Sequence, residues 1–252
     1  MKSKSPRKRL DTLLIERGLA ESLAKAQAMI LAGEVRIDGQ PAHKAGDSIP
    51  ANSRLEIASR NLKYASRAGL KLEGALHDFA LDPTGTICLD IGSSTGGFTD
   101  CLLQSGATQV FAVDVNTDQL TWKLQQDPRV IQVKKNARDL KPTDIPNQQS
   151  IDLAVADVSF ISATKILQPA AALLKPGANF LILVKPQFEL PRADITKGGI
   201  VTDSTLHEKA IAKVRAAAEN FQLAVLSVRP SRLSGAEGNQ EYFLHARKNP
   251  LE

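Results

Sequence analysis

Cysteine is scarce in this chain of 252 residues, which contains only Cys88 and Cys101. Both lie in apolar surroundings, and two cysteines cannot build a disulfide framework or a four-cysteine zinc site. The four histidines are scattered along the sequence without the spacing of metal ligands. We therefore expect two reduced core cysteines, no metal site and a mechanism that does not use histidine.

Long apolar runs are also missing. No uninterrupted apolar segment approaches the roughly 20 residues that span a bilayer. The basic N-terminus is followed by a segment that Asp11, Glu16 and Arg17 interrupt, unlike a signal peptide. The sequence therefore predicts a cytoplasmic protein that does not enter the membrane. The polar termini favour a monomer.

The positive charge is confined to one end of the chain. Residues 1–63 hold 12 of the 32 Lys and Arg residues and 7 of the 27 Asp and Glu residues, which leaves 20 of each sign in the remainder. Phosphate neutralisation dominates affinity for nucleic acids, so a basic module on a neutral body indicates a polyanionic partner. A solvated basic tail is the alternative interpretation.

Residues 1–60 begin with two patterns that are typical of short helices. Apolar residues recur at helical spacing within 9–18, and Ser22 is placed to cap a second helix that stops at Gly33. We expect two helices before any strand. The apolar face of the second is expected to comprise Ala24, Ala28, Ile30 and Leu31.

Alternating apolar and polar residues follow at 35–37 and 55–57. The first of these runs leads into Asp38-Gly39, a dipeptide that favours a hairpin turn. The N-terminal 60 residues are therefore predicted to form a compact α+β domain, followed by a polar linker at 61–63.

From residue 64 to 252, apolar runs alternate with amphipathic helices, as in a mainly parallel sheet covered on both faces. Helices are expected at 162–174 and 206–221. The last two strands leave no room for a helix between them and should pair antiparallel, which suits a methyltransferase rather than a dehydrogenase. The expected strands are 86–91, 109–115, 130–133, 152–156, 180–184, 224–228 and 241–246.

A glycine-rich turn follows the first of these strands. The strand ends near Asp90 and runs into Gly92 and Gly96, after which a helix begins, and Asp114 closes the second strand where an acidic residue can accept from ribose hydroxyls. The spacing is not that of a dinucleotide-binding loop, because its middle position is Ser94. This pattern favours S-adenosylmethionine over NAD, with a purely structural turn as the alternative.

Three further charged residues stand at strand ends. Asp157 follows one apolar run, Lys185 follows the next and Glu241 begins the last strand. Ligands bind at the carboxyl edge of such sheets, so these side chains are expected to form a cluster there. Each alone is more often a surface charge or a helix cap.

The chain resembles the TlyA family, often labelled hemolysin, within the FtsJ-like ribose 2′-O-methyltransferases. The resemblance covers nearly the whole length and rests on long motifs in both parts: 9–18, 24–30 and 33–39, then 66–72, 89–99, 156–162, 184–189 and 238–243. It implies a Rossmann-like class I methyltransferase sheet of seven strands, the last one antiparallel. It also implies a small N-terminal α+β domain of the S4 RNA-binding type.

The resemblance carries a Lys-Asp-Lys-Glu tetrad onto Lys71, Asp157, Lys185 and Glu241. Where many relatives have an adenine-contacting Asp, this chain offers Asn136, whose amide can still bond the adenine edge. The implied S-adenosylmethionine site comprises Asp90, Gly92, Ser94, Gly96, Gly97, Phe98, Asp114, Asn136 and Asp157.

A ribose hydroxyl is a weak nucleophile until its proton is removed, and Lys185 is the candidate to contact the 2′-oxygen and accept that proton. The role requires a neutral amine, and alignment of the reacting atoms contributes alongside basicity. A purely structural ion-pair network is the alternative. Family resemblance points to cytidine in ribosomal RNA, either free or within a ribosomal subunit. The candidate RNA contacts are Arg9, Lys25, Arg36, Lys44 and Arg67.

Three other functions remain open from the sequence. A non-catalytic RNA or ribosome-binding protein on a methyltransferase fold would fail to bind S-adenosylmethionine. A pore-forming hemolysin would make liposomes leak. An NAD-dependent oxidoreductase would bind NADH in competition with S-adenosylhomocysteine. The intact tetrad and the absence of an export or membrane segment argue against the first two.

Overall fold

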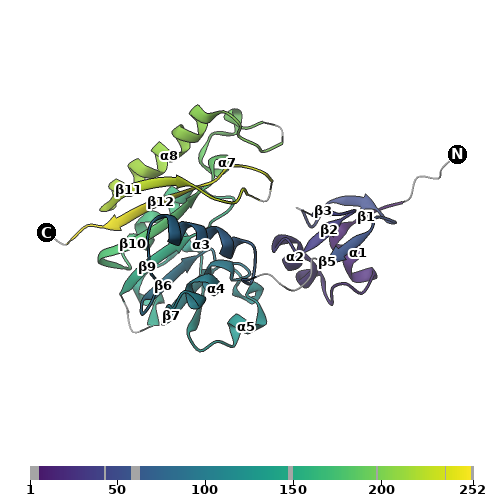
Figure 1. Cartoon of the computed structure of the whole chain (residues 1–252), viewed down its shortest axis with the longest axis horizontal. Coiled ribbons are helices and arrows are strands. Elements are labelled where there is room, and N and C mark those ends of the chain that lie inside the picture. The colour runs from purple at the N-terminus through teal and green to yellow at the C-terminus, as the bar shows by residue number, and fades with distance from the viewer. Residues whose placement is uncertain are drawn as a thin grey trace. The chain divides into compact units, whose positions relative to one another are not determined.

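The computed structural model describes residues 6–42, 44–57, 63–146, 150–196, 198–235 and 237–250. The chain divides into two compact units, Met1–Arg67 and Ala68–Glu252 (Figure 1). Residues 61 and 62 of the expected linker lie outside the described residues. Within the described part, no helix is long and apolar enough to cross a membrane, and no group of three His, Cys, Asp or Glu side chains is placed to hold a metal ion.

The N-terminal unit packs two helices against short strands. Its core is formed by buried residues that include Leu10, Leu14 and Ile30. Asp38 and Gly39 both have positive φ, at 50° and 84°, so the expected turn dipeptide does join two paired strands. The elements are β1 (Arg7–Arg9), α1 (Leu10–Glu16), α2 (Leu23–Leu31), β2 (Val35–Ile37), β3 (Gln40–Pro41), β4 (Ser48–Pro50) and β5 (Leu55–Ile57).

Two expectations for this unit were wrong. A strand, β1, precedes the helices and pairs with β4 antiparallel, which three charged residues in a row gave no reason to expect. The buried face of α2 comprises Ala26, Met29 and Ile30, whereas Leu31 is 62% exposed and Ala24 is exposed. Of the expected face, Ile30 is buried and Ala28 is partly buried, so the face that packs on the core is turned toward Ala26 and Met29.

The C-terminal unit is built on a seven-stranded sheet in the order β11-β12-β10-β9-β6-β7-β8. Among the strands that the structure describes in this sheet, β12 alone runs antiparallel to its neighbours, so the predicted sheet with an antiparallel last strand is confirmed. The strands are β6 (Ile87–Ile91), β7 (Gln109–Asp114), β8 (Val130–Lys134), β9 (Ile151–Ala156), β10 (Leu174–Val184), β11 (Leu223–Pro230) and β12 (Tyr242–Lys248). The helices are α3 (Ala68–Asp78), α4 (Gly97–Gln104), α5 (Trp122–Gln125), α6 (Leu167–Ala171), α7 (Pro186–Glu189) and α8 (Ser204–Glu219).

The helix expected at 162–174 is broken. A 3-10 turn at Ala163–Lys165 is followed by the short α6, and β10 already begins at Leu174. Pro169 has no N–H to bond the carbonyl of Lys165, so one continuous helix cannot run through this segment. The start of β10 is extended through a register shift between Leu174 and Asn179.

Alternate residues of the central strands serve the two faces of the sheet. Leu89 and Ile91 of β6 point into a large apolar core that also receives α6 and α8. On the other face, α3 and α4 cover the middle of the sheet, as they do in the front of Figure 1, and Phe98 of α4 stacks on Phe243 of β12. Cys88 and Cys101 are buried and unpaired, as expected. The helices thus cover the two faces of the sheet, and loops surround its carboxyl edge.

Candidate active site

Three neighbouring strands bring charged residues to one edge of the sheet. β10 lies between β9 and β12, and Val184 pairs with Tyr242. Asp157 directly follows β9, Lys185 directly follows β10 and Glu241 directly precedes β12. The expected cluster at the carboxyl edge therefore forms, because two parallel strands end where the antiparallel one begins.

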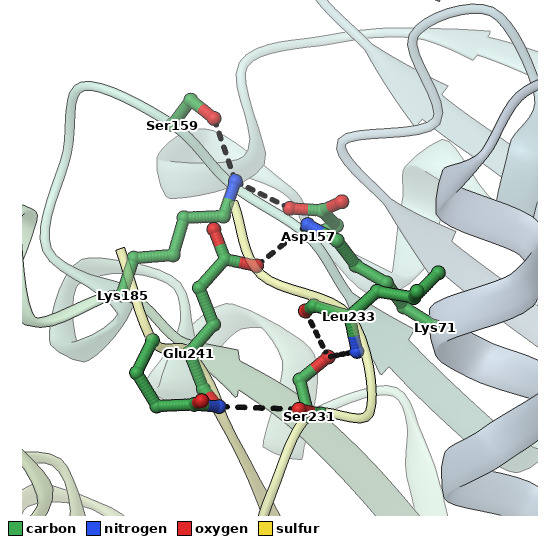
Figure 2. Close-up of polar contacts among 8 residues, drawn as sticks. Lys71, Asp157, Ser159, Lys185, Ser231, Leu233 and Glu241 are labelled. Carbon is green, nitrogen blue, oxygen red and sulfur yellow. Dashed lines mark hydrogen bonds and ion pairs between the residues drawn. The ribbon is translucent and has the colours of Figure 1, made fainter. Parts of the chain in front are cut away.

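A fourth residue reaches this cluster from the helix layer. Lys71 points inward from α3, and its Nζ lies 2.6 Å from Glu241 Oε2. Lys185 Nζ lies 2.5 Å from Asp157 Oδ1 and donates a hydrogen bond of 2.8 Å to Ser159 Oγ (Figure 2). The structure thus assembles all four members of the predicted tetrad as two adjacent ion pairs.

The tetrad is electrically balanced and almost closed to solvent. Lys71 and Glu241 are buried, and Lys185 is 8% exposed. Burial alone raises the pKa of Asp157, but the charges of Lys185 and Lys71 outweigh it and hold that pKa below its ordinary value. Asp157 is therefore an anion across the neutral range, and its buried Oδ1 forms an ion pair with Lys185 Nζ but, among the described residues, no hydrogen bond. Asp157 is thus suited to form an ion pair with a lysine, and it does not carry a proton at neutral pH.

The glycine-rich loop passes directly beside this cluster. Gly92 has φ of +84°, and a Cβ there would lie 2.5 Å from the backbone oxygen of Asp157. Gly96 has φ of +94°, and its Cβ would lie 2.2 Å from Leu124 Cδ1. Both positions therefore require glycine for conformation and for space. Ser94 between them also has positive φ, at 48°.

Asp90 lies fully buried beneath the loop. Its Oδ2 accepts a 2.6 Å hydrogen bond from Thr99, while among the described residues neither its Oδ1 nor Oγ of the buried Ser93 has a partner. Burial raises the pKa of Asp90 to about 7, and the nearby carboxylates of Asp157 and Asp114 act in the same direction. A buried acceptor without a donor is costly, so this pair of orphaned oxygens fits a ligand that brings donors or positive charge.

The remaining predicted cofactor residues are placed in different ways. Asp114 accepts from the backbone N–H groups of Ser94 and Asn116, which fastens the loop to β7. Asn136 caps a 3-10 turn by accepting from Arg138 N. Gly97 begins α4, whereas the Phe98 side chain is buried against β12. The backbone of Phe98 therefore belongs to the end of the glycine-rich loop, while its ring packs on β12.

A hollow of about 730 Å³ lies along the segments that follow β9 and β10. Phe160, Gln187, Phe188 and Arg192 contribute to its lining. Phe160 is 88% exposed with φ of +65°, and its ring centroid lies 5.3 Å from that of Phe188. The Phe188 centroid is in turn 6.0 Å from Lys185 Nζ. The Phe188 ring thus lies between the hollow that it lines and the lysine of the tetrad.

The predicted RNA contacts all lie in the first compact unit, Met1–Arg67, but their surroundings differ. Arg9 holds the buried Asp11 through two hydrogen bonds, at 2.6 and 3.1 Å. Arg67 packs its side chain against Gly33. Lys25, Arg36 and Lys44 are exposed. The structure therefore gives Arg9 a structural task in addition to any contact with RNA.

The sequence reasoning missed residues that hold the tetrad in place. Ser159 contacts Lys185, and buried Glu189 accepts from Ala163 N at 2.6 Å, which ties the segment after β9 to the one after β10. Asn239 accepts from Val201 N and donates to Gly199 O, and is 1% exposed. All three stand inside or beside the motifs that carried the resemblance, but polar residues that bond to backbone have no recognisable spacing.

Comparison with known proteins gives matches over both units. The FtsJ-like methyltransferase family matches residues 64–248, and the S4 domain family matches residues 8–55. These matches, together with the observed sheet, confirm the expected methyltransferase fold and S4-type unit.

Individual relatives match almost end to end. YqxC of Bacillus subtilis, named as a candidate rRNA methyltransferase, is 44% identical over 96% of this chain and 86% of its own length. The 16S/23S rRNA (cytidine-2′-O)-methyltransferase TlyA of Mycobacterium tuberculosis is 41% identical over 96% of this chain and 90% of its own. A solved structure labelled as a hemolysin, from Streptococcus thermophilus, is 41% identical with a TM-score of 0.74, covering 97% of this chain and 89% of that one.

Proposed function

Because the chain belongs to the FtsJ-like methyltransferase family, we propose that it methylates the ribose 2′-hydroxyl of a cytidine in ribosomal RNA. The family match confirms the predicted enzyme class, an S-adenosylmethionine-dependent methyltransferase. The observation that carries the proposal is the pair of buried ion pairs, Lys71–Glu241 and Lys185–Asp157, set beside a glycine-rich loop at the carboxyl edge of the sheet.

The loop fits S-adenosylmethionine, which supplies an electrophilic methyl group on a positively charged sulfur. Asp90 Oδ1 and Ser93 Oγ, which lack partners among the described residues, would accept from this cation's amino group. Asp114 and Asn136 would hold the ribose and adenine ends. Gly92, Ser94, Gly96, Gly97 and the Phe98 backbone would line the passage between them.

Lys185 performs the proton transfer in this proposal. Its neutral amine takes the proton of the 2′-hydroxyl as the ribose oxygen forms a bond to the methyl carbon and the carbon–sulfur bond breaks. Asp157 stays ionised and stabilises the resulting ammonium. Lys71 and Glu241 neutralise each other and fix the walls of the site, so the oxygen, carbon and sulfur atoms can be aligned.

The N-terminal unit binds the RNA. We assign residues 1–60 to the S4-type domain, 61–63 to a linker and 64–252 to the methyltransferase domain. Lys25, Arg36 and Lys44 bind phosphates, together with Arg9 and with Arg67 near the start of the methyltransferase domain. Their contacts are independent of base sequence, so they set affinity and leave the choice of nucleotide to the catalytic unit. The enzyme works as a monomer in the cytoplasm, where ribosomal RNA lies.

The test is transfer of labelled methyl from S-adenosylmethionine to free ribosomal RNA and to isolated ribosomal subunits, followed by digestion to nucleosides. Native protein should yield 2′-O-methylcytidine, and Lys185→Ala should abolish the label while binding the cofactor normally. Lys209→Ala, at an exposed lysine of α8, is the matched control and should retain full activity. Cofactor binding without transfer to any RNA would contradict the proposal and favour a non-catalytic RNA-binding protein.

A further inference from the structure

Lys185 has two oxygen partners, and only one of them belongs to the tetrad. Among the described residues, Asp157 Oδ1 at 2.5 Å and Ser159 Oγ at 2.8 Å are the oxygens recorded within bonding distance of its Nζ. The two acceptors lie on either side of the nitrogen in Figure 2. Both come from the loop after β9, so a single short segment determines how the amine is oriented.

The other groups around Lys185 do not compete for its hydrogens. Glu241 is engaged by Lys71, and the Phe188 ring offers only a face whose centroid is 6.0 Å from Nζ. Lys71 is a donor and cannot accept from another amine. Ser159 is therefore the neutral acceptor of the catalytic lysine.

A neutral lysine amine has two N–H groups and one lone pair around its nitrogen. Ser159 accepts one N–H, and the Asp157 carboxylate, an ion-pair partner, attracts the other, so the lone pair is left in the third direction. Since the loop occupies the first two directions, a substrate that gives its proton to Lys185 has to approach from the third. We propose that Ser159 is a positioning residue that fixes the rotation of the Lys185 amine, so that its lone pair faces the ribose 2′-hydroxyl. The inference rests on the proton-accepting role proposed for Lys185.

Loss of the Ser159 hydroxyl has two consequences. The amine gains freedom to rotate and presents an N–H to the substrate for part of the time, which slows proton abstraction without weakening RNA binding. The ammonium also loses an acceptor, and hydrogen bonding to a charged form stabilises that form. The lysine should therefore give up its proton more readily, with Asp157, Lys71 and Glu241 unchanged around it.

The experiment compares Ser159→Ala with Ser159→Thr, which restores a hydroxyl, and with Ser150→Ala, at an exposed serine before the opposite end of β9. In single-turnover methyl transfer to ribosomal RNA, Ser159→Ala should be slower by roughly 10- to 100-fold. Its KM for RNA and its affinity for S-adenosylmethionine should match the native values. The acid limb of its pH–rate profile should move to lower pH. Ser159→Thr should recover most of the rate, and Ser150→Ala should behave as native.

A second measurement needs no turnover. In protein labelled with 13C-lysine, the titration of the Lys185 side chain by NMR should move to lower pH in Ser159→Ala and return in Ser159→Thr. A native rate together with an unmoved titration in Ser159→Ala overturns the inference. If native protein transfers no methyl group to any RNA, the proposed function fails, and the NMR titration alone then decides whether Ser159 controls the amine.

Discussion

Lys71 and Glu241 are 170 positions apart in the sequence, yet their side chains form an ion pair of 2.6 Å with only 7% and 3% of each exposed. The pair joins α3, which precedes the first strand of the sheet, to the start of its last strand. The ion pair therefore links the first helix of the C-terminal unit to its last strand at the active site. Breaking such a pair leaves one buried charge without a counterion.

We expect Lys71→Met to lower the free energy of unfolding by about 3 to 5 kcal/mol, because Glu241 would remain buried and unpaired. The double variant Lys71→Met/Glu241→Gln should recover much of that loss but none of the methyl transfer. Urea unfolding followed by circular dichroism measures the first effect. A double variant no more stable than the single one would show that the ion pair is not what Lys71 contributes.

Asp90 should make both stability and cofactor binding depend on pH. Its pKa is raised from 3.8 to about 7, so the folded protein favours the protonated form. The stability from this group is full below its unfolded value and is lost as pH rises through about 7. Asp90→Asn avoids that loss, so its melting temperature relative to native should improve between about pH 5 and about pH 8.

The same carboxylate should favour a cationic ligand once it is ionised. Calorimetry should show native affinity for S-adenosylmethionine rising as pH increases through about 7, and Asp90→Asn should bind weakly throughout. Asp118→Asn, at a surface position 79% exposed, is the control and should follow the native curve. Native-like binding by Asp90→Asn at high pH would remove Asp90 from the cofactor site.

Gly92 and Gly177 separate backbone strain from crowding. Both have positive φ, but a Cβ at Gly177 meets nothing within 4 Å, whereas one at Gly92 lies 2.5 Å from the Asp157 backbone. Gly177→Ala should cost about 1 kcal/mol of stability and leave cofactor affinity unchanged. Gly92→Ala should cost more and weaken S-adenosylmethionine binding by at least about tenfold, which isothermal calorimetry would measure. Equal behaviour of the two variants would mean that the loop tolerates displacement.

The exposed basic residues of the N-terminal unit should act through phosphate alone. Replacing Lys25 and Arg36 by alanine should weaken binding to ribosomal RNA and reduce the slope of log K against log salt by about 1 for each residue. Filter binding over a range of salt concentrations measures that slope. Lys209→Ala, on the catalytic unit, should leave it unchanged. An unaltered slope in the double variant would place the RNA contacts elsewhere.

Much of the fold could be predicted because its signals are local. All seven strands of the C-terminal sheet were expected within a few residues at most ends, since a buried parallel strand is a short apolar run that glycine, proline or charge interrupts. The early start of β10 was missed because Lys175, Pro176 and Gly177 interrupt the apolar pattern there. β1 was missed because its three residues are all basic and its partner β4 is about 40 residues away.

The sequence by itself determined which residue types stand at strand ends, since the strands are short apolar runs and the short connection before β12 makes the last pair antiparallel. Only the tertiary structure decided how those residues pair. Lys71 takes Glu241 and Lys185 takes Asp157, and Ser159 joins the second pair. The reason is that pairing depends on side-chain distances of a few ångströms, which are set by how α3 packs on the sheet and by the turn of one loop. The spacing of residues along the chain indicates neither how α3 packs nor how the loop turns.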